Sequence, residues 1–180
     1  MTLIALFALQ DASLDAFYKF KPETAWTYKR IEGNVERRIE AKVLGEENGR
    51  VKLDWREVNL DGTLYKKSTV TWFVKDGVLR AEAASENEGT FEIPILKAGA
   101  KKGDAWSNAE GESSCLGAEE VKVPAAAYKD ALHARLNAGN ADSPVHIDFY
   151  LVPKIGLVKL TIASPEGPNS FELAEFKEGK

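Results

Sequence analysis

The stretch VERRIEAKVL, residues 35–44, changes between apolar and charged side chains at almost every step. Its two sides are formed by Val35, Ile39, Ala41 and Val43 and by Glu36, Arg38, Glu40 and Lys42. Successive side chains of a β-strand point to opposite faces of the sheet, so the pattern predicts a strand with one buried and one solvated face. The same alternation returns in residues 51–56, 70–74 and 145–151. It favours an antiparallel sheet, which can leave one face in water.

Turn-forming residues recur between these alternating stretches. Pairs such as Asp76-Gly77 accept the positive φ of tight hairpin turns, so strands that are neighbours in sequence are expected to pair, as in a meander. At Gly156 the inward-facing positions change from one set of alternate residues to the other, which indicates a β-bulge. The strands are predicted at approximately residues 24–31, 34–44, 50–59, 63–74, 78–84, 89–93, 104–111, 113–123, 128–137, 145–152, 156–163 and 170–177.

The segment before the first strand has a helical spacing of apolar side chains. Leu14, Phe17 and Tyr18 recur at i, i+3 and i+4, which predicts a short helix over residues 11–20 with Ser13 as its N-cap. A sheet with this many strands cannot stay flat and must curl. We expect the helix to bury its apolar side against the concave face of that curled sheet.

The chain of 180 residues is long enough for one well-buried core and short for two domains. It contains no linker rich in proline, glycine and serine and no low-complexity tract. Residues 13–180 are therefore interpreted as one mainly β domain. The predicted architecture is a single, strongly curved antiparallel sheet of about 11–12 strands in a meander, forming a half-barrel or open barrel with one short N-terminal helix.

Residues 1–12 have the apolar character of a signal-peptide remnant. Residues 2–9 are almost wholly apolar, and the chain turns polar at Gln10. The run is short and no Lys or Arg precedes it, so an ordinary first helix or strand is the alternative. As a signal-peptide core, the run predicts export to the bacterial periplasm or beyond. No other segment approaches the roughly 20 apolar residues that span a bilayer, so no transmembrane segment is expected in the mature chain.

Charge and motifs exclude several classes of function. The 24 basic and 28 acidic residues give a net charge of −4 with interleaved signs, so nucleic acid is not an expected partner. The sequence has no phosphate loop, no Gly-x-Ser-x-Gly, no His-Glu-x-x-His and no CxxC pair. No cofactor or metal site is therefore predicted.

The single cysteine and the two histidines do not form a recognisable site. Cys115 is expected to be a buried or half-buried structural thiol. His133 and His146 both fall on the polar side of their predicted strands. An enzyme would need one of them to meet acidic residues in a cleft, which this strand parity disfavours. The chain is therefore predicted not to be an enzyme.

Four segments carry a resemblance to a known family. They are ETAWTY (residues 23–28), KKGDAW (101–106), EEVKVPAAAYKDAL (119–132) and FYLVPKIGLVKL (149–160). Together they resemble an uncharacterised family of exported bacterial β-proteins, a domain of unknown function that is related in shape to the lipoprotein-carrier (LolA-like) half-barrels. Glu23 and Ala127 stand where the family has glycine, and Tyr128 takes the aromatic position. The resemblance implies an exported, curved β-domain and brings no catalytic residues.

The four tryptophans lie on separate predicted strands, and at least Trp55 and Trp72 lie on the apolar side of theirs. They either fill the core or line a concave pocket for an acyl chain or another hydrophobic ligand. The pocket interpretation predicts an apolar cavity lined by Val51, Leu53, Trp55, Val70 and Trp72.

Two non-enzymatic functions follow from these alternatives. The first is an exported domain that binds a hydrophobic ligand, a lipid or a lipoprotein in its concave face. The second is a protein–protein interaction or envelope-scaffold module without a ligand, whose partner is another envelope protein and whose interior is filled.

Overall fold

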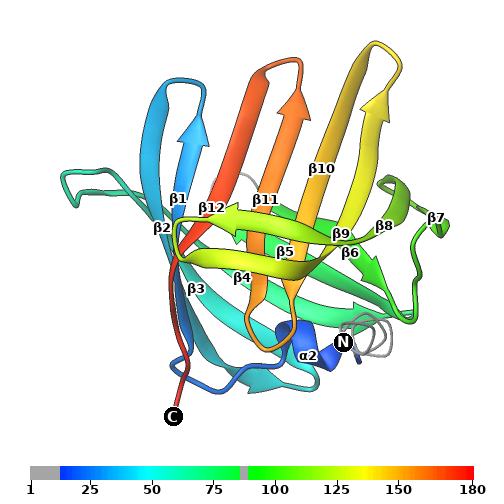
Figure 1. The fold of residues 1–180 in the computed structure, drawn as a ribbon. Coiled ribbons are helices and arrows are strands. Elements are labelled where there is room, and N and C mark those ends of the chain that lie inside the picture. The colour runs from blue at the N-terminus through cyan, green and yellow to red at the C-terminus, as the bar shows by residue number, and fades with distance from the viewer. Residues whose placement is uncertain (1–12, 86–88) are drawn as a thin grey trace.

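The computed structural model describes residues 13–85 and 89–180, which form a single antiparallel sheet and one short helix (Figure 1). The predicted mainly β architecture is confirmed. The elements are α2 (Asp15–Tyr18), β1 (Ala25–Glu32), β2 (Val35–Glu47), β3 (Arg50–Val58), β4 (Leu64–Lys75), β5 (Val78–Ser85), β6 (Gly89–Lys97), β7 (Ala105–Asn108), β8 (Gly111–Val123), β9 (Ala126–Asn140), β10 (Ser143–Val152), β11 (Gly156–Ser164) and β12 (Gly167–Lys177).

The strands follow the order β6-β5-β4-β3-β2-β1-β12-β11-β10-β9-β8-β7. Each half of the chain is thus a six-stranded meander, and the two halves join where the first strand pairs with the last. The sheet is interrupted between β6 and β7, which form its two edges in the described chain. Tight turns connect the hairpins as predicted; at Asp76 and Gly77 both φ angles are positive, at 52° and 72°.

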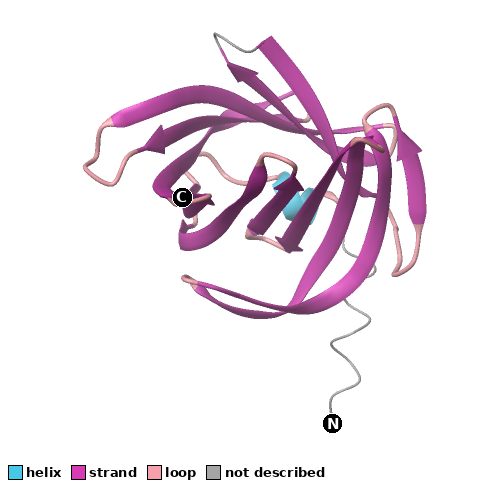
Figure 2. Ribbon diagram, turned by 90° about the horizontal axis from the view of Figure 1, so that it is seen from above, coloured by secondary structure: helices cyan, strands magenta, loops and turns pink. Residues whose placement is uncertain are grey.

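The sheet curls until its two edges approach each other, so that β6 contacts β8 and β9. Seen from above, the strands surround a common interior, and helix α2 is visible near its centre (Figure 2). Ion pairs bridge the two edges. Arg80 of β5 lies 2.5 Å from Glu92 of β6 and 3.6 Å from Glu110 in the turn before β8. The curl therefore produces a nearly closed barrel.

Helix α2 is shorter than the sequence pattern predicts. It spans four residues and ends because Lys19 adopts an extended backbone with ψ of 99°. Leu14 is the N-cap, and Ser13 lies one position earlier, where its Oγ accepts the Asp15 N–H at 3.3 Å. Residues 11 and 12 of the expected helix, like the apolar run 1–12, lie outside the described residues.

The helix closes one end of the barrel, beside the turn between β10 and β11 (Figure 1). Leu14, Phe17 and Tyr18 are buried in the core, as predicted. The Lys154 N–H in that turn donates to the Ala16 carbonyl at 2.6 Å. A Cβ at Gly156 would lie 2.8 Å from Cζ of Phe20, so the absence of a side chain there allows the helix to approach the sheet.

The predicted bulge near Gly156 is also confirmed. On β10 and β11, Tyr150 pairs with Lys159 and Leu151 pairs with Leu157, which leaves Val158 as the extra residue. A bulge of this kind sharpens the local bend of a strand.

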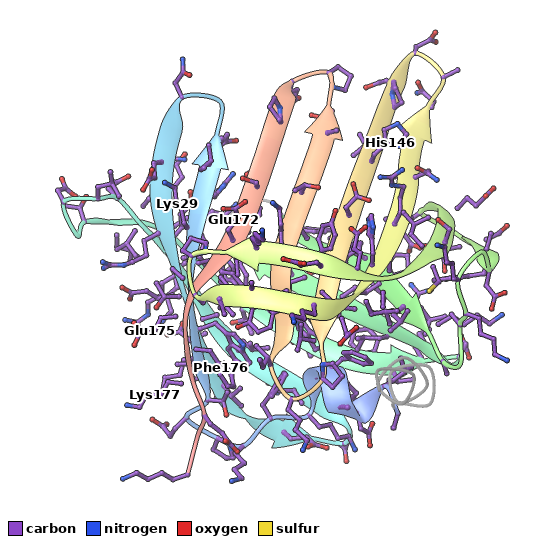
Figure 3. The ribbon with its side chains drawn as sticks, viewed as in Figure 1. Lys29, His146, Glu172, Glu175, Phe176 and Lys177 are labelled. Atoms are coloured by element: carbon purple, nitrogen blue, oxygen red, sulfur yellow. The ribbon has the colours of Figure 1, made fainter. Side chains whose placement is uncertain are left out.

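The outer face of the sheet carries charged side chains, many of them in cross-strand ion pairs. Lys29 lies 2.7 Å from Glu36, and Lys159 lies 2.8 Å from Glu172. Lys29 and Glu172 are labelled in Figure 3, where they project from the neighbouring strands β1 and β12. Because these pairs are in contact with water, each contributes little to stability and mainly keeps this face solvated.

Candidate functional site

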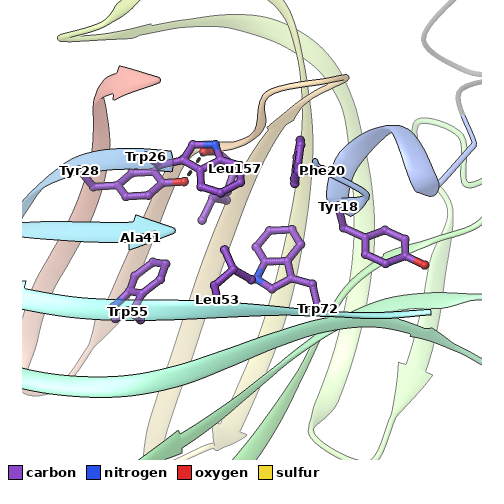
Figure 4. Close-up of a pocket in the computed structure, with 9 residues that line it drawn as sticks. All are labelled: Tyr18, Phe20, Trp26, Tyr28, Ala41, Leu53, Trp55, Trp72 and Leu157. Carbon is purple, nitrogen blue, oxygen red and sulfur yellow. Dashed lines mark hydrogen bonds between the residues drawn. The ribbon is translucent and has the colours of Figure 1, made fainter. Parts of the chain in front are cut away.

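The interior of the barrel is divided into two unlike ends. We call the part beside α2 the helix end; it is lined by Tyr18, Phe20, Trp26, Tyr28, Ala41, Leu53, Trp55, Trp72 and Leu157 (Figure 4). The space left among these side chains is only about 20 Å³. Protein interiors normally pack this densely. The helix end is therefore a filled core.

Hydrogen bonds from the aromatic side chains hold the helix end in place. The Trp26 Nε1–H donates to the Ile155 carbonyl at 2.7 Å, and the Tyr28 hydroxyl donates to the Leu157 carbonyl at 2.9 Å. The Tyr28 ring stacks on Trp55 with a centroid distance of 5.9 Å. Burial raises the pKa of Tyr28, with a smaller contribution from Tyr128, so its hydroxyl stays protonated and able to donate.

At the opposite end, which we call the mouth end, the two halves of the sheet enclose a cavity of about 310 Å³. Trp55, Trp72 and Leu157 border both this cavity and the helix end, so they form its floor. The remaining lining residues are Arg30, Glu57, Lys66, Ser68, Val70, Ala81, Ala83, Phe91, Ile93, Ile95, Ile147, Phe149, Leu160, Ile162, Asn169 and Phe171. Most of these side chains are apolar, and they come from β1, β3–β6 and β10–β12.

A buried ion-pair cluster lies against the cavity. Glu57, whose side chain is 5% exposed, accepts hydrogen bonds from Arg30 at 2.5 Å and from Arg37 at 3.2 Å. The second guanidinium nitrogen of Arg30 lies 3.0 Å from Glu32, which is 50% exposed. The Arg30 Nε–H also donates to Asn169 of β12 at 3.4 Å. The cluster therefore joins β1, β2, β3 and β12 at one side of the cavity.

The five residues predicted to line a pocket do not all face the cavity. Val70 borders the cavity, and Trp55 and Trp72 form part of its floor. Leu53 belongs to the helix end, and Val51 is fully buried and lines neither space. The structure thus brings three of the five to the cavity and places the other two in the core.

The sequence pattern did not single out the charged and small residues of the lining. Arg30 is an even number of positions from Trp26 and Tyr28, and Glu57 is two positions from Trp55. The alternation therefore already indicated that both charged side chains face inward. Ala81 and Ala83 also face inward, and their small side chains leave much of the space open.

One of the two histidines lies among acidic residues on the outer face, and it lines neither end of the interior. His133 is buried between Asp148, whose Oδ1 lies 2.7 Å from Nε2, and Glu119, whose Oε1 lies 3.1 Å from Nδ1. The register of β9 with β8 and β10 brings these outward-facing side chains together. The cluster lies away from the cavity, since its neighbours Ile147 and Phe149 are the residues that face inward.

Arg135 completes this outer cluster by donating to both oxygens of Asp148, at 2.7 and 3.2 Å. Burial alone would raise the pKa of Asp148, but the hydrogen bonds from Arg135 and His133 outweigh it and hold that pKa below its usual value. His146 lies apart, near the tip of the β9–β10 hairpin, and contacts Asn137 at 2.8 Å (Figure 3).

Cys115 is buried, as predicted, and burial raises the pKa of its thiol. In the part of the chain that the structure describes, no group of three or more His, Cys, Asp or Glu side chains is placed to hold a metal ion. Across residues 13–85 and 89–180, no helix is long and apolar enough to cross a membrane.

Two solved structures share this fold. A crystal structure of a candidate lipoprotein from Parabacteroides distasonis superposes with a TM-score of 0.65 at 15% identity, over 91% of this chain and 100% of the other. A candidate exported protein with YmcC-like fold from Bacteroides fragilis superposes with a TM-score of 0.58 at 11% identity, over 90% and 99% of the two chains. At these identities the likeness establishes the fold alone. No protein-family model and no curated protein sequence matches the chain.

Proposed function

We propose that this protein is a non-enzymatic binding domain that holds a hydrophobic ligand in the mouth-end cavity. The observation that carries the proposal is the cavity itself, a space of about 310 Å³ with a mostly apolar lining beside the tightly packed helix end. Sites for small molecules have this character, with volumes of roughly 300–1,000 Å³ and a few polar groups among apolar side chains. A lipid or the acyl chain of a lipoprotein has the matching chemistry.

The unfilled space of the cavity is unfavourable for the stability of the fold. Unfilled apolar space costs roughly 24 cal/mol per Å³, because its lining loses contacts that a packed core would make. The helix end of the same barrel avoids this cost by tight aromatic packing. An open apolar space at the mouth end is therefore best explained by an occupant.

Export to the bacterial envelope belongs to the same proposal. It is supported by the apolar run of residues 2–9 and by the names of the two fold neighbours, a candidate lipoprotein and a candidate exported protein. A carrier shaped like the LolA-like half-barrels would act in that compartment. Expression with the natural upstream region, followed by cell fractionation and N-terminal sequencing, tests the proposal; a cytoplasmic protein with an unprocessed N-terminus would contradict it.

The binding proposal is tested first by native mass spectrometry of the purified protein with lipid extraction, and then by titration with a fluorescent fatty acid. A stoichiometric bound lipid and saturable probe binding are expected. A ligand-free mass together with no probe binding would overturn the proposal.

A matched pair of variants locates the binding. Ala83 faces the cavity, whereas its neighbour Ala84 is exposed on the other face of β5. We expect Ala83→Leu to fill part of the cavity and weaken probe binding about tenfold, equivalent to about 1.4 kcal/mol. Ala84→Leu should leave probe binding unchanged. Equal binding by both variants would place the probe elsewhere on the protein.

The envelope-scaffold function remains the second candidate. It is favoured by the edge strands β6 and β7, whose unpaired backbone groups resemble the edges that other proteins extend with a partner strand. A scaffold of this kind needs no ligand, so the probe titration distinguishes the two candidates.

A further inference from the structure

The polar side chains of the cavity are gathered on one side of its mouth. Arg30 is hydrogen-bonded to Glu57 and to Asn169, and Lys66 lies opposite Glu57 in the register of β3 with β4. Ser68 follows on the same face of β4. The other lining residues are apolar and lead down to the floor. A ligand that matches this lining has one polar end and one apolar body.

The two carboxylates that contact the arginines on this polar side are unequally buried. Two arginines, with side chains 17% and 16% exposed, share the single buried carboxylate of Glu57. The other carboxylate that the arginines contact is Glu32, which is half exposed to water. Two largely buried guanidinium groups therefore have one buried carboxylate between them.

The contacts with Glu32 are the ones that a ligand could replace. Ion pairs that remain in water contribute little to stability, so the arginines lose little when a ligand anion takes the place of Glu32. The attraction between the arginines and that anion is less screened, because the mouth holds less water than the surface around Glu32. Glu57 is not available in this way, because both of its oxygens already accept hydrogen bonds from the arginines. Arg37 also has a buried Nε–H that finds no acceptor among the described residues.

From this arrangement we infer that the ligand is an amphiphile with one anionic head group, a carboxylate or a phosphate, bound beside Arg30, Arg37 and Lys66. Its apolar tail runs down toward the floor formed by Trp55, Trp72 and Leu157. This inference rests on the proposed function, since it names the class of ligand for the same cavity. A cationic head would be repelled by the guanidinium groups of Arg30 and Arg37, and a neutral head would gain no charge attraction from them.

The test is a head-group series with one tail, measured by calorimetric titration of the wild-type protein below micelle concentrations. The probes are dodecanoate, dodecyl phosphate, dodecanol and dodecyltrimethylammonium. We expect at least one anion to bind about tenfold or more tightly than dodecanol, and the cation to bind most weakly. The preference for the anion should shrink as salt is raised, because screening weakens charge attraction.

Adjacent lysines provide the matched variants. Lys66 lines the cavity, whereas Lys67 projects from the other face of β4, 3.5 Å from Asp54. Lys66→Gln is expected to reduce the anion-to-alcohol affinity ratio about threefold to tenfold without changing the affinity for dodecanol. Lys67→Gln should leave the ratio at its wild-type value. An unchanged ratio in Lys66→Gln would contradict the placement of the head group.

The head-group series separates failure of the inference from failure of the proposed function. Dodecanol binding as tightly as both anions would overturn the anionic head group and leave hydrophobic binding intact. Absence of binding by all four probes would overturn both. A preference for dodecyl phosphate over dodecanoate supports the inference with a phospholipid-like source, and the reverse preference supports it with a free fatty acid.

Discussion

The two ends of the barrel interior are built from the same strands and yet differ completely in packing. Along β1, Trp26 and Tyr28 face the helix end, and Arg30 faces the mouth end. Along β4, Trp72 lies at the floor, and Lys66 lies at the mouth. The helix end retains about 20 Å³ of free space and the mouth end about 310 Å³.

Side-chain size and polarity, rather than backbone geometry, decide where this barrel is open. At the helix end, large rings and the inserted helix fill the space. At the mouth end, small residues such as Ala81 and Ala83 face inward, and Arg30 and Glu57 bond with each other beside the cavity. The helix end is therefore part of the packed core, whereas the mouth end keeps an open cavity, where we propose that a ligand binds.

The largest effect should come from emptying the helix end. Phe17 is fully buried there, so Phe17→Ala is expected to lower the free energy of unfolding by about 3–5 kcal/mol. At the mouth, Phe91 is 51% exposed, and Phe91→Ala should cost less than about 1 kcal/mol. Urea unfolding of both variants measures the contrast. Similar losses would mean that the two ends contribute equally to the core.

A smaller loss is expected on breaking the charged cluster at the mouth. Glu57→Gln removes the buried carboxylate that Arg30 and Arg37 share, which should destabilise the fold by about 2–3 kcal/mol. The control is Glu40→Gln, because the Arg38–Glu40 pair at 2.7 Å lies in water and should contribute less than about 1 kcal/mol. Thermal and urea unfolding of both variants provide the comparison, and a neutral Glu57→Gln would show that the cluster is not structurally required.

A third substitution tests how closely the helix must approach the sheet. Gly156 has φ of +84°, and a Cβ there would crowd Phe20 and the Phe17 carbonyl. Gly33 has φ of +56° with open space around it. Gly33→Ala should therefore cost about 1 kcal/mol from backbone strain alone, and Gly156→Ala about 2 kcal/mol because crowding is added. Equal losses in urea unfolding would indicate that the helix yields without cost.

The smallest effect concerns the outer face, which should influence neither end of the interior. Because the folded pKa of Asp148 is below its unfolded value, the carboxylate stabilises the fold above about pH 4, and this contribution disappears as the pH falls through the folded pKa. Asp148→Asn should cost about 1 kcal/mol at neutral pH and nearly nothing in strong acid. Unfolding measured across that pH range tests this. The exposed turn variant Asp142→Asn should change the stability at neutral pH by less than about 0.5 kcal/mol. Affinity for the fluorescent probe should be unchanged in both variants.

Much of the fold follows from local pattern. Alternation along residues such as Val35 to Leu44 predicts strands, because the period of two holds wherever one face is buried. Turns such as Asp76-Gly77 were predictable from their tolerance of positive φ. The length of helix α2 was not, because four residues have little helical preference of their own and depend on contacts with the sheet.

The candidate site was only partly predictable for a related reason. The alternation correctly placed Val70, Trp55 and Trp72 on the inner face of the sheet. It does not predict at which end of the barrel an inward-facing side chain lies. Val51 and Leu53 have the correct parity and still lie in the core rather than in the cavity. Arg30 and Glu57 were overlooked because each inward-facing charge is acceptable only through its partner, and that partner lies on another strand.

The sequence alone determined the strands, the turns, the buried face of each strand and the bulge near Gly156, because each depends on the nearest neighbours in the chain. Only the tertiary structure decided that β1 pairs with β12, that the sheet opens between β6 and β7, and that Arg30 meets Glu57. These contacts join residues far apart in sequence, so they depend on how the whole sheet curls. The cavity belongs to this second group, since its walls come from both halves of the chain.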